Sequence, residues 1–290
     1  MSDNTNKKKV KEHVHVTPRL IISYIVLAIL TFLCLFFFYI LIINSTRSHI
    51  QIQQGFSFLP GGHFQKNFLN VINDAKLPIL IGLKNSLIVS TCAAVLSCYF
   101  SALTAYGLYA YDFKLKKAAV VFILLILVMP TQVSALGFIQ LITKINLMDT
   151  LLPLFLPSIA APAVFYFMYS YMQSSLPMEL LEAARIDGCS EFKTFNKIVL
   201  PIMKPALAVQ AIFVFVSNWN NFFMPALVIS SNDKKTLPIL IASLRSADFL
   251  KFDMGKIYMF ILLAIVPIII VYILLSKYIV AGVTLGGVKE

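Results

Sequence analysis

The sequence predicts an all-α integral membrane protein with six transmembrane helices and a charged cytoplasmic loop between helices four and five. Of its residues 59% are hydrophobic and only 13% are charged, about half the charged share of a soluble domain. Six apolar runs each contain at least 20 consecutive uncharged residues, enough to cross ~30 Å of hydrocarbon as a helix. Barrel strands would be shorter and would alternate in polarity. The predicted spans are 20–43, 85–111, 118–143, 150–175, 205–231 and 257–278.

Lysine and arginine in short loops orient such spans, because they stay on the cytoplasmic side. Residues 7–19 hold five of them and the loop 112–117 holds three, whereas the loop 144–149, on the other side, holds one. This predicts that both termini and the loop 176–204 are cytoplasmic. Residues 1–19 would be a cytoplasmic tail, and 20–290 one transmembrane domain. The net charge of +11 is then explained by orientation and by membrane lipid, not by nucleic acid.

The segments between the spans carry further signals. In the outer loop 233–256, "TLPILIASLRSADFL" predicts a short helix on the membrane surface. Prolines inside the spans predict kinks, because proline removes a helical hydrogen bond. These prolines are Pro130, Pro162, Pro225 and Pro267.

Several kinds of chemistry have no matching residues in the sequence. It has no GxxxxGK[ST], so the chain has no nucleotide-binding P-loop of its own. No predicted span has an Asp, Glu, Lys or Arg in its interior, although proton-driven carriers usually need one. The four cysteines show neither CxxC nor zinc spacing, so we expect ordinary packing residues and no metal. The energy for any transport would come from another protein, and no cofactor would be bound by this chain.

The loop 176–204 begins with "LPMELLEAARIDGCSEF", which predicts two short helices separated by a turn at Gly188. Pro177 is a suitable start for the first helix, and Ser190 a suitable cap for the second. The first helix would be amphipathic, with an apolar face of Leu180, Leu181 and Ala184 and a charged face of Glu179, Glu182 and Arg185. Physical reasoning alone leaves two interpretations open: a solvated helix resting on the membrane, or a docking element.

The spacing of residues along this loop favours the docking element. The row Glu182-Ala183-Ala184, three residues, Gly188, nine residues, Ile198-x-Leu200-Pro201 resembles the EAA loop of binding-protein-dependent ABC transporter permeases. "FVFVSNWNNFFMPALVI" resembles the family's F-x-x-x-WN-x-F-x-x-P stretch. "KYIVAGVTLGGVKE" resembles the tail of the smaller maltose-type permease of oligosaccharide-class sugar importers, except that a glycine usually follows the lysine there. The resemblance runs from about residue 84 to the end.

The resemblance implies a permease subunit that forms half of a translocation path for a sugar, with an oligosaccharide expected, in a bacterial or archaeal inner membrane. The sugar would arrive on an extracellular binding protein. The partners would be a second, homologous permease and two cytoplasmic ATPase subunits that use ATP and Mg. In the family the EAA helix docks into a cleft on the ATPase. The residues expected to couple to the ATPase are Glu182, Ala183, Ala184, Arg185, Asp187, Gly188, Leu200 and Pro201. Ala183 and Ala184 would pack in that cleft, and Glu182 would pair with a basic group.

Amides and an aromatic ring near the middle of the fifth predicted span are candidates for the path, because amides bind sugar hydroxyls and rings stack on sugar faces. The candidates are Asn218, Trp219 and Asn221, with Gln132 in the third span. The competing role for these amides is hydrogen bonding between helices. The competing functions for the whole chain are a secondary carrier or channel that needs no ATPase, and a structural or assembly factor.

Overall fold

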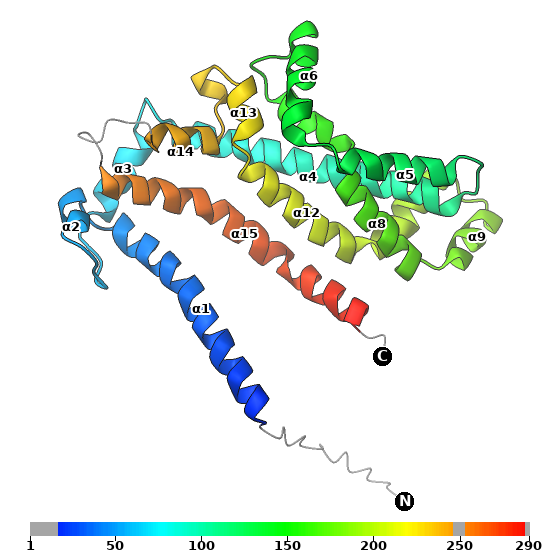
Figure 1. Cartoon of the computed structure of the whole chain (residues 1–290), viewed down its shortest axis with the longest axis horizontal. Coiled ribbons are helices and arrows are strands. Elements are labelled where there is room, and N and C mark those ends of the chain that lie inside the picture. The colour runs from blue at the N-terminus through cyan, green and yellow to red at the C-terminus, as the bar shows by residue number, and fades with distance from the viewer. Residues whose placement is uncertain (1–16, 246–252, 288–290) are drawn as a thin grey trace, which may run out of the picture.

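The computed structural model describes residues 17–245 and 253–287, and every regular element in these residues is helical (Figure 1). In chain order the elements are α1 Pro18–Ser45, α2 His49–Gln53, α3 Phe64–Ile72, α4 Ile79–Ala110, α5 Lys116–Leu127, α6 Thr131–Lys144, α7 Leu152–Phe155, η1 Leu156–Ile159, α8 Pro162–Ser175, α9 Met178–Ile186, α10 Glu191–Thr194, the π-helical turn η2 Phe195–Val199, α11 Leu200–Ile202, α12 Lys204–Trp219, α13 Phe223–Val228, η3 Asn232–Lys234, α14 Leu237–Arg245 and α15 Met254–Gly287. The predicted all-α class is confirmed.

Among the described residues, four helical segments are long and apolar enough to cross a membrane without a sharp bend. They are Pro18–Ser45, Ile79–Ala110, Leu152–Ser175 and Met254–Ser276. Two further pairs of helices meet this criterion together but are bent, so the count reaches six when each pair is one span. The predicted six is therefore the upper bound by length and composition.

The third predicted span, 118–143, is not one straight helix. The axes of α5 and α6 meet at 99°, and the extended residue Pro130 precedes α6. Proline cannot donate the helical hydrogen bond and disfavours helical geometry in the residue before it. The kink predicted at this proline is therefore a sharp break.

The fifth predicted span, 205–231, is also interrupted. Helix α12 ends at Trp219 and α13 begins at Phe223. The side-chain amides of Asn218 and Asn220 donate to backbone carbonyls four residues earlier, and Asn221 accepts from the backbone N–H of Met224 at 3.4 Å. Such local bonds compete with regular helix, which the uncharged composition of this run did not reveal.

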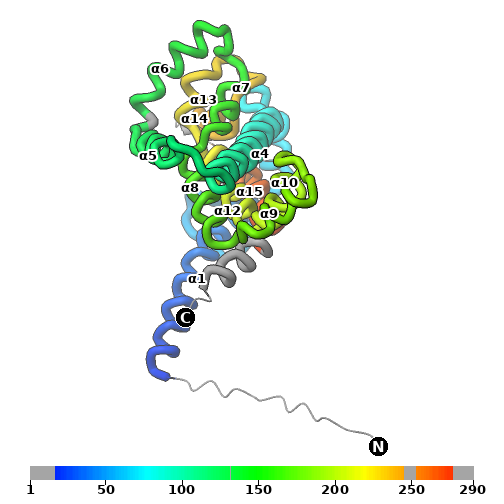
Figure 2. Tube along the Cα trace, turned by 90° about the vertical axis from the view of Figure 1, so that its right-hand side faces the viewer, coloured from blue at the N-terminus to red at the C-terminus, as the bar shows by residue number. Residues whose placement is uncertain are grey.

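Helix α4 is at the centre of the bundle. Helices α8 and α12 pack directly against it, α15 packs on α12, and α1 packs on α15 (Figure 2). The buried face of α4 is lined with glycine, serine and alanine, which allow helices in a membrane to approach closely. A Cβ at Gly82 would come 2.5 Å from a terminal methyl carbon of Leu240 on α14, so this leucine side chain would have to move for a larger residue to fit.

The two ends of the bundle differ in their short elements (Figure 1). Helices α9 and α10 are at one end, called here the α9 end. Helices α2 and α3 are at the other, called the α2 end. The helix predicted within 233–256 is present as α14. The predicted tail 1–19 lies outside the described residues except for its last three.

Candidate functional site

The α9 end contains the two short helices that the sequence predicts. Helix α9 follows the extended residue Pro177 and is stopped by Gly188, whose φ is +71°. The backbone N–H of Gly188 donates to the carbonyl of Arg185 at 3.0 Å, and that of Cys189 to the carbonyl of Ala184 at 2.9 Å. These bonds satisfy the last carbonyls of α9. A Cβ at Gly188 would meet nothing within 4 Å, so the glycine is needed for its backbone angle and not for space.

Helix α9 divides into an inner and an outer face, but not as the resemblance implies. Leu181 and Ala184 are 0% and 4% exposed and pack into the core of this chain. Ala183 is exposed, and the neighbouring Ile186 is 87% exposed. The expectation that Ala184 packs in a cleft of another subunit is therefore wrong for this conformation, because its own chain already covers it. The surface open to a partner includes Glu182, Ala183, Ile186 and the exposed Phe192 of α10. Leu180, which was predicted on the apolar face with Leu181 and Ala184, is also open, with 42% of its surface exposed.

Arg185 remains exposed, but its guanidinium bonds to other groups of this chain. Its Nε donates to Glu191 Oε1 at 2.8 Å, and its Nη2 donates to the carbonyl of Ala110 at the end of α4 at 3.3 Å. Its guanidinium is 5.2 Å from the centroid of the Tyr111 ring, a cation–π distance. The hydroxyl of Tyr106, on α4, donates to the other carboxylate oxygen of Glu191. We call Arg185, Glu191, Tyr106 and Tyr111 the latch, because together they join α9 and α10 to α4.

The latch is built around an ionised carboxylate. Hydrogen bonds from Tyr106 and then from Arg185 lower the pKa of Glu191, against the opposing effect of desolvation. Charge-assisted hydrogen bonds of this kind are roughly twice as strong as neutral ones. From the sequence, Arg185 was expected at a partner surface, and Glu191 was given no role there. The pairing was not predictable, because Tyr106 and Glu191 are 85 residues apart.

The remaining predicted coupling residues are Asp187, Leu200 and Pro201. Asp187 is exposed and caps the end of α9. Leu200 is half-buried against the core, and Pro201 is exposed. Both belong to α11, where the chain turns by 80° into α12. The structure therefore gathers all eight predicted residues at the α9 end but divides them between inner and outer positions.

The break between α12 and α13 is flanked by two cavities. One, of about 550 Å³, lies among the α5–α6 bend, α7, α8 and the break, and is lined by Asn221 and Ser134 among apolar side chains. The other, of about 490 Å³, lies among α12, α14 and α15 and is lined by Trp219 and Asn220. The predicted path residues therefore do not share one cavity.

Trp219 does not fit the role of a sugar-stacking ring. It is 3% exposed, it stacks on Phe215 with 5.5 Å between ring centroids, and its Nε1 donates to the carbonyl of Ala264 on α15 at 3.2 Å. That prediction is corrected here, because both the ring and the N–H are used in packing α12 on α15. Asn218 is half-buried and bonds within its own helix. Gln132 is exposed at the start of α6, two residues before Ser134 of the larger cavity.

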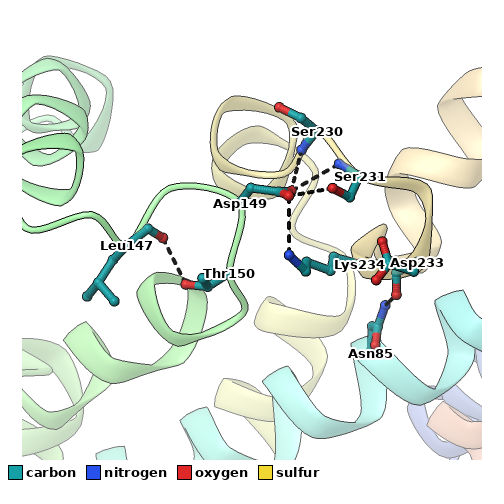
Figure 3. Close-up of polar contacts among 8 residues, drawn as sticks. All are labelled: Asn85, Leu147, Asp149, Thr150, Ser230, Ser231, Asp233 and Lys234. Carbon is teal, nitrogen blue, oxygen red and sulfur yellow. Dashed lines mark hydrogen bonds and ion pairs between the residues drawn. The ribbon is translucent and has the colours of Figure 1, made fainter.

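A polar cluster that sequence analysis missed joins two loops away from the α9 end (Figure 3). The carboxylate of Asp149 accepts from the backbone N–H groups of Ser230 and Ser231 at 2.9 and 3.0 Å, from the Ser231 hydroxyl, and from Lys234 at 3.2 Å. These hydrogen bonds, that of the Ser231 hydroxyl first, lower the pKa of Asp149 well below its usual range. Nearby, the amide of Asn85 donates to the carbonyls of Asp233 and Lys235 at 3.0 and 3.1 Å.

A multi-pass helical protein with broken helices beside open pockets, and a latched helix pair at one end, has the architecture of a membrane transport component. The chain belongs to the family described as binding-protein-dependent transport system inner membrane component, whose profile matches residues 97–284. It is therefore a permease subunit of an ABC importer. This family membership overturns the alternatives of a secondary carrier, a channel or an assembly factor.

Similar proteins agree with this assignment. The chain is 37% identical to the arabinooligosaccharides transport system permease protein AraQ of Halalkalibacterium halodurans, over 90% of this chain and 94% of that protein. It is 30% identical to the lactose transport system permease protein LacG of Rhizobium radiobacter, over 93% and 96%. A crystal structure of a bacterial ABC transporter that imports the acidic polysaccharide alginate contains a chain of the same fold. Its TM-score is 0.74 at 21% identity, covering 89% of this chain and 95% of that one.

Proposed function

We propose that this permease forms half of the translocation path for an oligosaccharide delivered by an extracellular binding protein. The relatives named for arabinooligosaccharides and lactose support the substrate class. A second, homologous permease would complete the path. Two cytoplasmic ATPase subunits would bind ATP and Mg, since this sequence has no P-loop. The lysine and arginine bias places both termini and the α9 end on the cytoplasmic side of a bacterial or archaeal inner membrane.

The exposed outer face of α9 and α10 is the observation that carries the coupling role. Ile186 and Phe192 are 87% and 68% exposed, at the end of the molecule where Glu182 and Ala183 are also open. Exposed apolar groups rimmed by charge are typical of a protein docking surface. The ATPase would dock on this outer face, while the latch passes its movement to α4. Ala184 and Arg185 then act inside the permease instead of at the interface.

The larger cavity is the part of the path that this chain would contribute. Its volume of about 550 Å³ is within the roughly 300–1,000 Å³ of small-molecule sites. Asn221 supplies an amide and Ser134 a hydroxyl to an otherwise apolar lining, a combination that orients a hydroxyl-rich ligand while its apolar faces contact the wall. Asn221 is therefore the proposed sugar contact on this chain.

The test is reconstitution of the whole importer in vesicles, with its companion permease, ATPases and binding protein. Uptake of an arabino-oligosaccharide or lactose should require ATP and the binding protein. Asn221→Leu should lower uptake about tenfold while all subunits still co-purify. Asn218→Leu is the matched control, since its amide bonds the carbonyl of Val214 in its own helix, and it should stay within twofold. ATP-independent uptake, or a chain that purifies without ATPases, would contradict the proposal.

A further inference from the structure

The Asp149 cluster, which comprises Asp149, Ser230, Ser231 and Lys234, fastens α7 to α13 (Figure 3). Asp149 lies three residues before α7, and its backbone N–H donates to the carbonyl of Val228, the last residue of α13, at 2.9 Å. Its carboxylate accepts from the backbone N–H groups of Ser230 and Ser231, which come directly after α13 and its terminal residue. Main-chain anchors of this kind leave less freedom than a contact between two long side chains, because they involve fewer rotatable bonds.

The backbone of the loop before α7 has an uncommon conformation. Asp149 has a φ of +55° and Asn146 a φ of +56°, in the left-handed region where aspartate and asparagine are the usual residues besides glycine. Such residues cost free energy and persist where the surrounding contacts hold them in place. The bonds of Asp149 to the residues after α13 are contacts of this kind. The loop therefore has a defined shape that depends on α13.

Both fastened helices line the cavity of about 550 Å³ beside the helix break. Helix α7 contributes Pro153 and Leu154, and the break and α13 contribute Asn221 and Met224. Pro153 follows Asp149 by only four residues, and Met224 precedes Val228 by four, which is about one helical turn. Leu154 and Val228 also belong to one buried apolar cluster. A change in the bonds of Asp149 would therefore shift α7 against α13 within the lining of the cavity.

We propose that Asp149 is a positioning residue of the translocation path, which fixes the width of this cavity and thereby limits the size of the sugar that passes. This rests on the proposed function, in which Asn221 of the same cavity contacts the sugar. Asp149 is not among the residues that line the cavity, so it acts through the two helices that it joins. A wall that cannot retreat rejects a longer sugar by steric clash, which is one of the ways in which a site discriminates between ligands.

The first test measures the geometry without transport. Spin labels are attached at Leu152→Cys on α7 and Leu227→Cys on α13, since both positions are 45% exposed. The chain is freed of its native cysteines and assembled with the other subunits, and electron paramagnetic resonance gives the distribution of distances between the labels. Asp149→Asn should at least double the width of this distribution, because an amide has only one oxygen with which to accept the bonds of the cluster.

Asn85→Ala is the matched control. It removes two hydrogen bonds to the neighbouring carbonyls of Asp233 and Lys235, so it should also lower the thermal midpoint of the complex. It leaves the bonds between Asp149 and the end of α13 in place, and the distribution of label distances should stay as in the wild type. If Asp149→Asn fails to assemble, Ser231→Ala removes only the hydroxyl that donates to the carboxylate and should change the distribution in the same direction.

The second test measures selectivity in the vesicle assay with an unchanged binding protein. The rate of uptake of an arabino-pentasaccharide is divided by that of the disaccharide. We expect this ratio to rise at least threefold in Asp149→Asn and to stay within 1.5-fold in Asn85→Ala, whereas a purely structural role would lower both rates in proportion. Unchanged label distances in Asp149→Asn, equal changes in both variants, or an unchanged ratio would overturn the proposal. A wild-type importer that takes up neither sugar would instead contradict the proposed function, which the label distances do not test.

Discussion

Two regions of the bundle, the α9 end and the loop cluster around Asp149, are each organised around a carboxylate, but they use it differently. Asp149 is bonded by two backbone N–H groups as well as by side chains, so it fastens one loop to another at fixed spacing. Glu191 is held by the side chains of Tyr106 and Arg185, which come from α4 and α9. A backbone clamp keeps a loop in place, whereas a side-chain latch joins whole helices.

The surroundings of the two carboxylates differ as well. Beside Glu191, the outer face of α9 and α10 leaves Ala183, Ile186 and Phe192 exposed. Around Asp149, the polar groups of the loops bond one another. Lys234 donates to the carboxylate, and the amide of Asn85 donates to the carbonyls of Asp233 and Lys235. We infer that the α9 end receives movement from a partner and passes it inward, while the Asp149 cluster holds its loops still.

The largest expected effect comes from reversing the charge of Glu182 on the outer face. Glu182→Lys would place a cation where the family resemblance expects a basic group of the ATPase. It should reduce ATP-driven uptake in vesicles at least tenfold, equivalent to about 1.4 kcal/mol, with normal membrane insertion. The control is Asp233→Lys, an equal charge change at an exposed site in the Asp149 region, which should stay within twofold. Equal losses of uptake in both variants would contradict the proposal that the ATPase contacts the α9 end and not the Asp149 region.

A matched pair of glycines tests the turn after α9. Gly188 and Gly107 both have open space for a Cβ, but only Gly188 has a positive φ. Gly188→Ala should therefore strain the turn, by roughly 1–3 kcal/mol for a non-glycine residue in this region, and Gly188→Val should do so more. ATP hydrolysis should continue while uptake falls severalfold. Gly107→Ala should leave both rates unchanged, and normal uptake by Gly188→Val would show that the turn is not a joint.

The latch predicts a smaller and more specific effect. Tyr106→Phe removes only the hydroxyl that donates to Glu191, and we expect the number of sugars imported per ATP hydrolysed to fall two- to fivefold. Tyr169→Phe is the control, since its ring stacks on Phe165 in the same core, and it should preserve this ratio. A reduced ratio in both variants, or in neither, would argue against the latch.

The Asp149 cluster should affect stability more than coupling. Asp149→Asn should lower the thermal midpoint of the complex by a few degrees while leaving uptake per ATP unchanged. The pKa of Asp149 is lowered from its ordinary 3.8, so its stabilisation is complete above about pH 5 and is lost progressively as the pH falls below this towards the lower folded-state value. The difference in midpoint between wild type and variant should therefore be constant from pH 8 to pH 5. A difference that shrinks within that range would contradict this assignment.

Part of this account was predictable from the sequence because its signals are local. Pro177 before α9 and Gly188 after it define a short helix by backbone chemistry alone. The uncharged runs likewise identify apolar helices by length. The breaks at Pro130 and between Trp219 and Phe223 were not predicted as such, because a proline or an asparagine within an apolar run is compatible with a kink or with a full interruption.

The rest depends on contacts between residues far apart in the chain. The amphipathic pattern of α9 identifies its two faces, but not that Arg185 bends inward to the carbonyl of Ala110. In the same way, the sequence around Trp219 did not reveal that its N–H donates to the carbonyl of Ala264 on α15. Arginine and tryptophan carry long side chains with polar tips, so their direction is set by tertiary partners.

The central claim is that α9 faces its own bundle with Ala184 and the ATPase with Ala183. It can be measured with two adjacent cysteines, Ala183→Cys and Ala184→Cys, each in a chain without Cys189. Labelling by a membrane-impermeant thiol reagent is followed in opened membranes, with and without the ATPase subunits. The account predicts fast labelling at position 183 that the ATPase suppresses at least fivefold, and slow labelling at position 184 in both conditions. Fast labelling at position 184, or labelling at position 183 that the ATPase leaves unchanged, would contradict it.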